Sequence, residues 1–307
     1  GGSTGRLVPI DQVARRGSGR FAEIQKGEHA TDGWQVGEPR RNQPRTRLVR
    51  GRPFAPARRS PILPHAPHRG KIALLASRPR PARVTPDDSA AEFATLAEAL
   101  AAHGIELEPE RVELLDRYRA ALWRWNEQLN LTRHTTHAKF VGRDVVDSLE
   151  LAKLIAPKRR VLDVGSGGGV PGLVIAICRP DLRVTVCEST QKKAKALQSL
   201  VDELGLPTEV FGCRAEELLE VRTFDAIVAR AVAPLAKMLS WLAPYWESFD
   251  ELLLVKGRSW VDERGEARHR GLMHGLELRK AATYALPGPA GESVILRIRR
   301  GDGGDLD

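Results

Sequence analysis

The strongest constraint on the fold is the alternation, from residue 160 onward, of short apolar runs with segments of helical period. The runs that read as buried strands are "RVLDV" (160–164), "RVTVCE" (183–188), "TEVFG" (208–212), "FDAIVARA" (224–231) and "ELLLVKG" (251–257). Helices are expected from Pro171, over "TQKKAKALQSLVDELG" and through Trp241, and an acidic turn follows "TEVFG". Such crossovers join parallel strands, so the sequence predicts an α/β fold with a Rossmann-like, doubly wound sheet.

The sheet is expected to be mostly parallel, with one exception near the carboxyl end. The runs "KAATYAL" (280–286) and "SVILRIR" (293–299) flank "PGPAGE", whose prolines and glycines are typical of a turn. We expect these two strands to form an antiparallel hairpin at the edge of the sheet.

Helices are expected before the first strand. Their expected ranges are Asp88 or Ser89 to Gly104, Pro109 to Leu129, and Lys139 to Ile155. Asp and Ser are good helix caps, Pro suits a first turn and Gly ends a helix. The apolar residues of the first two helices recur at three- and four-residue spacing: Phe93, Leu96, Ala97, Leu100, Leu114, Leu115, Tyr118, Leu122, Trp125 and Leu129.

Residues 1–83 differ in composition from the rest of the chain. They hold 18 Lys and Arg against 5 Asp and Glu, a net charge of +13, and half of the 20 prolines. Residues 84–307 hold 30 against 34, a net charge of −4. Because high charge with scattered apolar residues cannot offset the entropy of folding, we expect 1–83 to be disordered. The domain is then 84–307, with helices at 84–156 and the α/β core at 157–300.

Two interpretations of this basic extension stay open. An Arg-rich segment can bind RNA phosphates without sequence preference. Alternatively, the extension is not native: no Met precedes Met238, and Val84 opens a segment that a bacterial valine start codon could begin. A peptide from before Val84 in the mass spectrum of the native protein would contradict the second interpretation.

Several classes of protein are disfavoured. The sequence has no apolar run near the roughly 18 residues of a membrane span, and no charged start leading into a signal segment. Cys178, Cys187 and Cys213 lack the CxxC or Cys–His spacing of zinc sites. We therefore expect a cytoplasmic protein with no membrane association and no metal, and cysteines in the core or at strand ends.

The stretch "VLDVGSGGGVPGLVIA" (161–176) places a cluster of glycines in the first strand–helix turn. Ligands of doubly wound sheets bind beyond the carboxyl ends of the strands, and this turn is their usual place. Gly165, Gly167 and Gly169 permit positive φ and let a ligand approach the backbone. Gly167, Gly169 and Gly172 also fit the dinucleotide pattern GxGxxG, which is weak by itself. A tight turn without a ligand is the alternative.

Details around the loop favour S-adenosylmethionine over NAD. The Asp163 carboxylate ends the first strand, where it suits an ammonium group and would repel a pyrophosphate. Glu188 ends the second strand and can accept from two ribose hydroxyls, although NAD enzymes also place an acid there. Pro171 removes one amide where NAD enzymes hold pyrophosphate. Ala215 and Glu216 lie where an adenine could be read, or else simply begin a solvated helix.

The motifs "NLTRHT", "DVVDSLELA", "VLDVGSGGGVPGLVIAICRPD", "VCEST", "FDAIVARAVAPL" and "LLLVKG" resemble the RsmG (GidB) family in order and spacing. The resemblance covers about Val84 to Arg300 and excludes the basic extension. It implies a class I S-adenosylmethionine-dependent methyltransferase that methylates N7 of a guanine in 16S ribosomal RNA. The glycine loop is shared by many methyltransferases, but Gly-x-Pro-Gly, "NLT" and "ARA" are more specific.

The resemblance also implies roles for individual residues. Cofactor contacts are expected at Gly165, Val170, Ala215, Glu216 and Arg230, and the acids Asp163 and Glu188 match as well. Positions around the cleft mouth are Asn130, Arg143, Asp147, Ser148 and Lys256. The chain departs from the family at Asp144, where a His is usual. If that position meets RNA phosphate, an Asp would repel it.

The chemistry of guanine N7 explains why no catalytic dyad is expected. N7 is a lone-pair acceptor without a proton to remove, so alignment is the main requirement. The chain lacks the Asn/Asp-Pro-Pro-aromatic motif of amine methylation after the fourth strand, and a Cys nucleophile after the fourth or fifth. We expect Arg230, Lys256, Asp147 and Arg143 to position the substrate. The alternatives are a surface residue at a helix start for Arg230 and a solvated strand end for Lys256.

The expected partner is 16S ribosomal RNA within the small ribosomal subunit, because a body of net charge −4 does not favour naked RNA. The target base must be unstacked or looped. Trp125 is expected in the core; Trp123 and Trp241 are undecided. We expect a monomer. The competing functions are a methyltransferase of small molecules or proteins, a non-catalytic RNA-binding module and, more remotely, an NAD enzyme.

Overall fold

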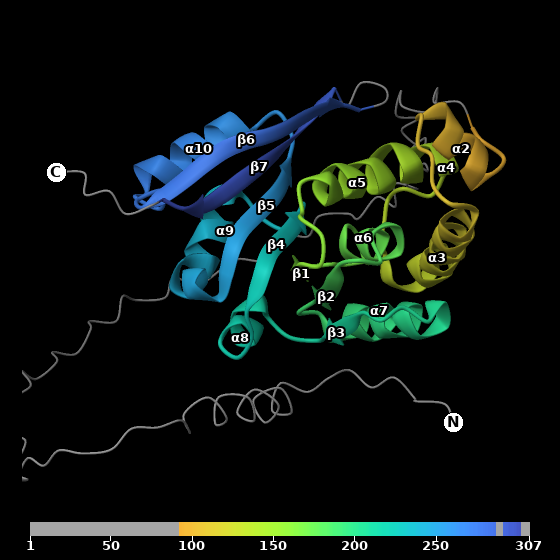
Figure 1. Cartoon of the computed structure of the whole chain (residues 1–307), viewed down its shortest axis with the longest axis horizontal. Coiled ribbons are helices and arrows are strands. Elements are labelled where there is room, and N and C mark those ends of the chain that lie inside the picture. Colours follow the sequence, from red (N-terminus) through yellow and green to blue (C-terminus); the bar gives the residue numbers. More distant parts are fainter. Residues whose placement is uncertain (1–91, 287–290, 302–307) are drawn as a thin grey trace, which may run out of the picture. The chain divides into compact units, whose positions relative to one another are not determined.

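One mixed sheet forms the core of the computed structural model, which describes residues 92–286 and 291–301. The strand order is β3-β2-β1-β4-β5-β7-β6 (Figure 1). The strands are β1 (Arg160–Val164), β2 (Arg183–Cys187), β3 (Glu209–Phe211), β4 (Phe224–Arg230), β5 (Phe249–Lys256), β6 (Leu276–Ala285) and β7 (Glu292–Arg300). Pairs from β3 to β5 are parallel, whereas β7 is antiparallel to both β5 and β6. The expected doubly wound sheet with an antiparallel edge hairpin is confirmed.

Helices cover both faces of this sheet. Those of the core are α6 (Gly172–Cys178), α7 (Gln191–Leu204), α8 (Ala215–Leu219), α9 (Leu235–Leu242), η2 (Ala243–Ser248, 3₁₀) and α10 (Trp260–His269). Alternate strand residues bury on opposite faces, so Val161 packs with α6 and α7 whereas Leu162 packs with α8 and α9. Figure 1 shows α6 and α7 on one side of the sheet, with α9 and α10 on the other.

Helix α10 was not expected from the sequence. Among its residues only Ala267 is buried, so the segment has almost no apolar period to reveal it. The helix nevertheless carries Glu263, which reaches back to the carboxyl ends of the strands.

The segment before β1 is helical, as expected, with shifted bounds. It contains α2 (Leu96–Ala102), α3 (Pro109–Leu129), α4 (His137–Lys139), the π-helix η1 (Phe140–Val145) and α5 (Val146–Lys153). Placing Phe93 inside the first helix was wrong: Thr95 caps that helix by accepting from the Glu98 N–H, so Phe93 precedes it. The expected caps Asp88 and Ser89 lie outside the described residues.

The third expected helix is interrupted by the π-helical turn η1. Its wider turn shifts the side chains of Arg143 and Asp144 relative to a regular α-helix, and such turns are frequent at functional sites. The expectations for residues 1–83 fall entirely outside the described residues. Across 92–286 and 291–301, no helix has the length and apolarity needed to cross a membrane.

Candidate functional site

The glycine loop lies between β1 and α6, where the strand order reverses between β1 and β4. Gly165 has a φ of +68° and Gly169 a φ of +100°, conformations that disfavour any side chain. A Cβ on Gly169 would also lie 2.6 Å from Leu173 Cδ1. The glycines are therefore required by the loop's own conformation and packing, and they leave its backbone accessible at the switch point of the sheet.

Asp163, near the end of β1, anchors this loop by a hydrogen bond. Its side chain is fully buried, and Oδ2 accepts from the Gly172 N–H at 2.9 Å. Oδ1 is buried without a hydrogen-bond partner among the described residues. Burial raises the pKa of Asp163 to about 6, against the opposing hydrogen bond from Gly172. The expected contact with an ammonium group stays a prediction, and the unpartnered oxygen is the atom available for it.

Glu188 follows β2 and also holds the loop. Its Oε2 accepts from the Gly167 N–H at 3.1 Å, and its Oε1 accepts from the Thr190 N–H at 2.7 Å. Each carboxylate oxygen has two lone pairs, so both can accept a further hydroxyl donor. The side chain is thus oriented before any ligand binds.

A cavity of about 110 Å³, here called the loop cavity, opens beside the glycine loop. It is lined by three of the predicted cofactor residues, Gly165, Ala215 and Glu216. Met238 and Trp241 supply apolar walls suited to a flat aromatic base, which gives Trp241 a place in this site. Val170 is instead buried against the core and does not line this cavity.

Two of the cysteines also line the loop cavity. Cys187 and Cys213 are buried free thiols with their sulfur atoms 3.9 Å apart, and the Cys187 thiol donates to the Cys213 carbonyl. This location at strand ends agrees with the expectation, whereas Cys178 is only partly buried. Within the described residues, no cluster of His, Cys, Asp and Glu could hold a metal ion.

A larger cavity of about 400 Å³, here called the β4–β5 cleft, adjoins the loop cavity through Val232. Arg143, Asp147, Arg230 and Lys256 line it, so the fold brings together all four residues predicted to position the substrate. They come from η1, α5, β4 and β5, which are distant in sequence.

Arg230 is the centre of a buried charge network in this cleft. Its Nη2 donates to Asp144 Oδ1 at 2.6 Å and its Nη1 donates to Asp147 Oδ2 at 3.1 Å. Burial lowers the pKa of Arg230, but the two carboxylates outweigh that effect, and the pKa is raised. The guanidinium therefore stays charged, and interpreting Arg230 as a surface residue at a helix start is wrong: its side chain is only 16% exposed.

The concern that Asp144 would repel RNA phosphate is corrected by its location. Its side chain is 0% exposed and pairs with Arg230 and with His134, so it meets no phosphate at the surface. Ser148 is likewise not at the cleft mouth, because it is buried and its Oγ donates to the Asp144 carbonyl at 2.6 Å. Asn130 is an exposed left-handed cap of α3 outside both cavities.

Lys256 ties the turn after β4 to α10. Its Nζ donates to the Ala233 carbonyl at 2.7 Å and to Glu263 Oε2 at 2.8 Å. Glu263 Oε2 also accepts from the Leu235 N–H at 2.7 Å. The alternative of a solvated strand end is wrong, since the Lys256 side chain is 11% exposed. This clamp holds the turn in which Ala231 has a φ of +54°, a strained value for a non-glycine residue.

Sequence reasoning missed three residues of the site: His134, Glu263 and Tyr284. The Tyr284 hydroxyl donates to Asp147 Oδ1 at 2.7 Å, and His134 contacts Asp144. His134 follows the "NLT" motif, which was a usable signal. Tyr284 and Glu263 gave none, because their positions depend on the hairpin and on α10.

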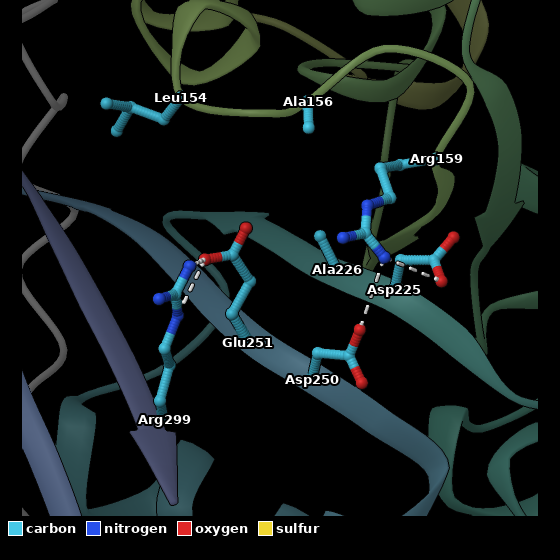
Figure 2. Close-up of a pocket in the computed structure, with 8 residues that line it drawn as sticks. All are labelled: Leu154, Ala156, Arg159, Asp225, Ala226, Asp250, Glu251 and Arg299. Carbon is cyan, nitrogen blue, oxygen red and sulfur yellow. Dashed lines mark hydrogen bonds and ion pairs between the residues drawn. The ribbon is translucent and has the colours of Figure 1, made fainter.

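A third cavity, of about 350 Å³, lies at the opposite, amino ends of the parallel strands (Figure 2). Arg159 lies 3.4 Å from Asp225 and 3.5 Å from Asp250, and Arg299 pairs with Glu251 at 2.6 Å. None of the predicted site residues lines this cavity. Its charged groups are matched to one another, so it does not resemble a prepared ligand site.

Comparison with known proteins matches the region that builds the site. The sequence profile described as rRNA small subunit methyltransferase G (GidB) matches residues 111–286. The ribosomal RNA small subunit methyltransferase G of Rhodopirellula baltica is 54% identical over 202 residues, 66% of this chain and 86% of that protein. The proteins of the same name from Chromobacterium violaceum and Sorangium cellulosum are 42% and 39% identical. These two matches cover 67% and 66% of this chain and 96% and 85% of those proteins.

Proposed function

From the premise that this chain belongs to the GidB family, described as rRNA small subunit methyltransferase G, we propose that it methylates N7 of a guanine in 16S ribosomal RNA. The enzyme class follows from the family: an S-adenosylmethionine-dependent methyltransferase of small-subunit rRNA. The base and the atom are the proposal.

The observation that supports N7 as the methylated atom is that the carboxylates lining the β4–β5 cleft are already hydrogen-bonded. Asp147 accepts from Arg230 and Tyr284, and Glu263 accepts from Lys256 and the Leu235 amide. Among the described lining residues, no carboxylate or imidazole is therefore left as an unengaged general base. Guanine N7 has no proton to lose, so its methylation is the reaction that such a cleft can support by alignment alone.

The loop cavity suits the flat base of the proposed cofactor, and Asp163 and Glu188 lie next to its lining residues at the ends of β1 and β2. The residues proposed to hold S-adenosylmethionine are Asp163, Gly165, Gly167, Gly169, Val170, Glu188, Ala215, Glu216 and Arg230. The fit rests on the unpartnered Asp163 Oδ1, the spare lone pairs of Glu188 and the apolar wall at Trp241. When bound, the cofactor supplies an electrophilic methyl carbon attached to a positively charged sulfur.

The protein's own residues orient the base and exclude water. Methyl transfer would leave the guanine ring positively charged, since N7 donates its lone pair to the methyl carbon, the carbon–sulfur bond breaks to leave a neutral sulfur, and no proton departs. Asp147 lines the cleft and its carboxylate favours a cationic ring, while the Arg230 guanidinium, which is bound to Asp144 and Asp147, offsets part of this charge. Lys256 and Glu263 hold the turn after β4 at the wall of the cleft.

The proposed substrate is a guanine presented by the folded small ribosomal subunit in an unstacked segment. The enzyme is proposed to act as a monomer in the cytoplasm without a metal ion. Residues 84–307 carry a net negative charge and attract RNA only weakly. The small ribosomal subunit can supply additional contacts through its folded RNA and its proteins.

The test is transfer of labelled methyl from S-adenosylmethionine by the full chain. The acceptors are small subunits lacking N7 methylation, RNA extracted from them, and unrelated RNA, followed by nucleoside analysis. We expect label in 7-methylguanosine, with subunits as the best acceptor. Label in another nucleoside would contradict the N7 assignment. Binding of the cofactor without label in any RNA would favour a non-RNA acceptor or a binding module.

A further inference from the structure

His134 is a site residue to which neither the motifs nor the relatives' names give a role. It lies between α3 and α4, where its backbone is fixed at both polar atoms. The His134 carbonyl accepts from Trp123 Nε1 at 3.0 Å, and its N–H donates to Thr132 Oγ1 at 3.0 Å. Its imidazole Nδ1 lies 2.7 Å from Asp144 Oδ1, with 26% of the side chain exposed.

The contact with Asp144 determines which nitrogen of His134 carries hydrogen. Because an ionised carboxylate paired with Arg230 only accepts, Nδ1 must be the donor. A neutral imidazole with hydrogen on Nδ1 already satisfies this contact. The role of His134 toward Asp144 is therefore that of a hydrogen-bond donor, and an added positive charge is not required for it.

Two donors converge on a single oxygen of Asp144. Oδ1 accepts from His134 Nδ1 and from Arg230 Nη2, while Oδ2 is buried without a partner among the described residues. This asymmetry fixes the rotation of the carboxylate, since turning it would break both contacts. Without His134 the two oxygens become nearly equivalent acceptors, and Arg230 can follow either one.

The fixed carboxylate in turn fixes Arg230 at the wall of the β4–β5 cleft. The other side of the guanidinium contacts Asp147 Oδ2, and Asp147 Oδ1 accepts from Tyr284. A row of five side chains thus runs from His134 through Asp144, Arg230 and Asp147 to Tyr284. The neighbouring ionisable groups are Arg143 on η1, Tyr118 on α3 and Asp163 on β1.

We propose that His134 is a positioning residue for methyl transfer, which acts through Asp144 to hold the Arg230 guanidinium in place. This inference rests on the proposed function, because Arg230 matters only if the cleft holds the acceptor base. Small displacements of a positioning group can cost about 10²-fold in rate. Arg230 lines the cleft and is also among the residues proposed to hold the cofactor, so we expect the loss of His134 to act mainly on transfer and to a smaller extent on cofactor affinity.

The experiment compares three variants of the full chain with small subunits as acceptor. His134→Ala removes the donor, and His134→Asn keeps one, because the Asn amide nitrogen occupies a position similar to Nδ1. His137→Ala is the matched control, since its imidazole Nδ1 makes a 3.0 Å contact with the Phe93 carbonyl, away from Arg230. The readouts are kcat, KM for each substrate, cofactor affinity by calorimetry and the melting temperature.

We expect His134→Ala to lower kcat at least tenfold while cofactor affinity falls by a smaller factor than kcat. His134→Asn should recover kcat to within threefold of the wild type, and His137→Ala should stay within twofold. If His134→Ala does not fold, His134→Leu replaces it, because Leu fills much of the ring's volume without a donor.

Two results would overturn the inference while leaving the proposed function intact. One is an unchanged kcat in the donor-free variant. The other is His134→Asn losing as much kcat and melting temperature as His134→Ala, which would indicate a structural role only. A wild type that binds cofactor and labels no RNA would instead overturn the proposed function, and the inference with it.

Discussion

The two cavities of the site are built in different ways. Around the loop cavity, the supporting contacts are shorter in sequence: Asp163 and Gly172 are 9 positions apart, and Gly167 and Glu188 are 21 apart. In the β4–β5 cleft, the Arg230 contacts span 83 and 86 positions, and Tyr284 reaches Asp147 across 137. The first cavity depends on a local backbone conformation, whereas the second depends on charged side chains that only the complete fold assembles.

The largest expected effect is in the cleft. Arg230→Met should destabilise the protein by about 4 kcal/mol, because it leaves two buried carboxylates without their cation. Methyl transfer should fall by at least about 10²-fold, since the guanidinium proposed to position the base is lost. Chemical denaturation and single-turnover labelling measure the two effects.

Arg159→Met is the matched control for this prediction. Arg159 also lies between two carboxylates, Asp225 and Asp250, but at the amino ends of the strands and with 49% of its side chain exposed (Figure 2). Because exposed ion pairs contribute little, this variant should lose less than about 1 kcal/mol and keep full transfer activity. Equal losses in the two variants would contradict the distinction between a buried cleft network and surface pairs.

The second effect tests the local character of the loop cavity. Gly169→Ala should cost about 3 kcal/mol, because the new Cβ combines a φ of +100° with a 2.6 Å approach to Leu173 Cδ1. Cofactor affinity should fall more than tenfold. Gly205→Ala is the control: its φ is +65° but nothing lies within 4 Å, so about 1 kcal/mol is expected. Similar losses in both would show that packing around Gly169 is unimportant.

This contrast explains what the sequence could predict. The strands, the glycine loop and the acids Asp163 and Glu188 follow from short patterns, because apolar period and glycine content act locally. The gathering of Arg143, Asp147, Arg230 and Lys256 was predicted only through the family resemblance.

The burial of Asp144 and the roles of His134 and Tyr284 could not be predicted from local patterns. Each depends on a partner from another element, and nothing in the local sequence of Asp144 distinguishes a buried, paired carboxylate from an exposed one. Helix α10 was missed for the complementary reason: only Ala267 is buried, so its place is fixed by contacts such as Glu263 with Lys256.

The third prediction uses the pH dependence of the loop cavity. The pKa of Asp163 rises from 3.8 to about 6 on folding, so the folded state binds a proton that the unfolded chain lacks between these values. Asp163 should therefore contribute stability that grows as pH falls from about 7 to 4, so the wild type should gain about 3 kcal/mol relative to Asp163→Asn for a shift of about two units. Asp163→Asn cannot ionise and should not show this gain.

Cofactor binding should respond to pH with the opposite sign. A positively charged ligand favours the ionised carboxylate, so affinity should fall as pH drops through about 6 in the wild type and stay flat in Asp163→Asn. Asp225→Asn is the control for stability: burial raises the pKa of Asp225, but the Arg160 hydrogen bonds outweigh it and lower the pKa. The stability that Asp225 contributes is therefore lost as pH falls, which is opposite in sign to the effect of Asp163. Parallel pH profiles for wild type and Asp163→Asn would contradict the assignment.

The smallest expected effect is at Tyr284, which lies at the end of the row of five side chains that has Arg230 at its centre. Tyr284→Phe removes the donor to the buried Asp147 Oδ1 but leaves the Arg230 contact, so we expect a loss of about 1 to 2 kcal/mol. Transfer should fall only a few fold, because Asp147 is still oriented by the guanidinium. The control Tyr245→Phe, whose hydroxyl contacts Glu220 at the surface, should leave stability and transfer unchanged. If Tyr284→Phe instead abolished transfer with little loss of stability, the hydroxyl would contribute to the base's site directly. The cleft would then extend to the edge hairpin, and its dependence on distant elements would be greater than the Arg230 contacts alone indicate.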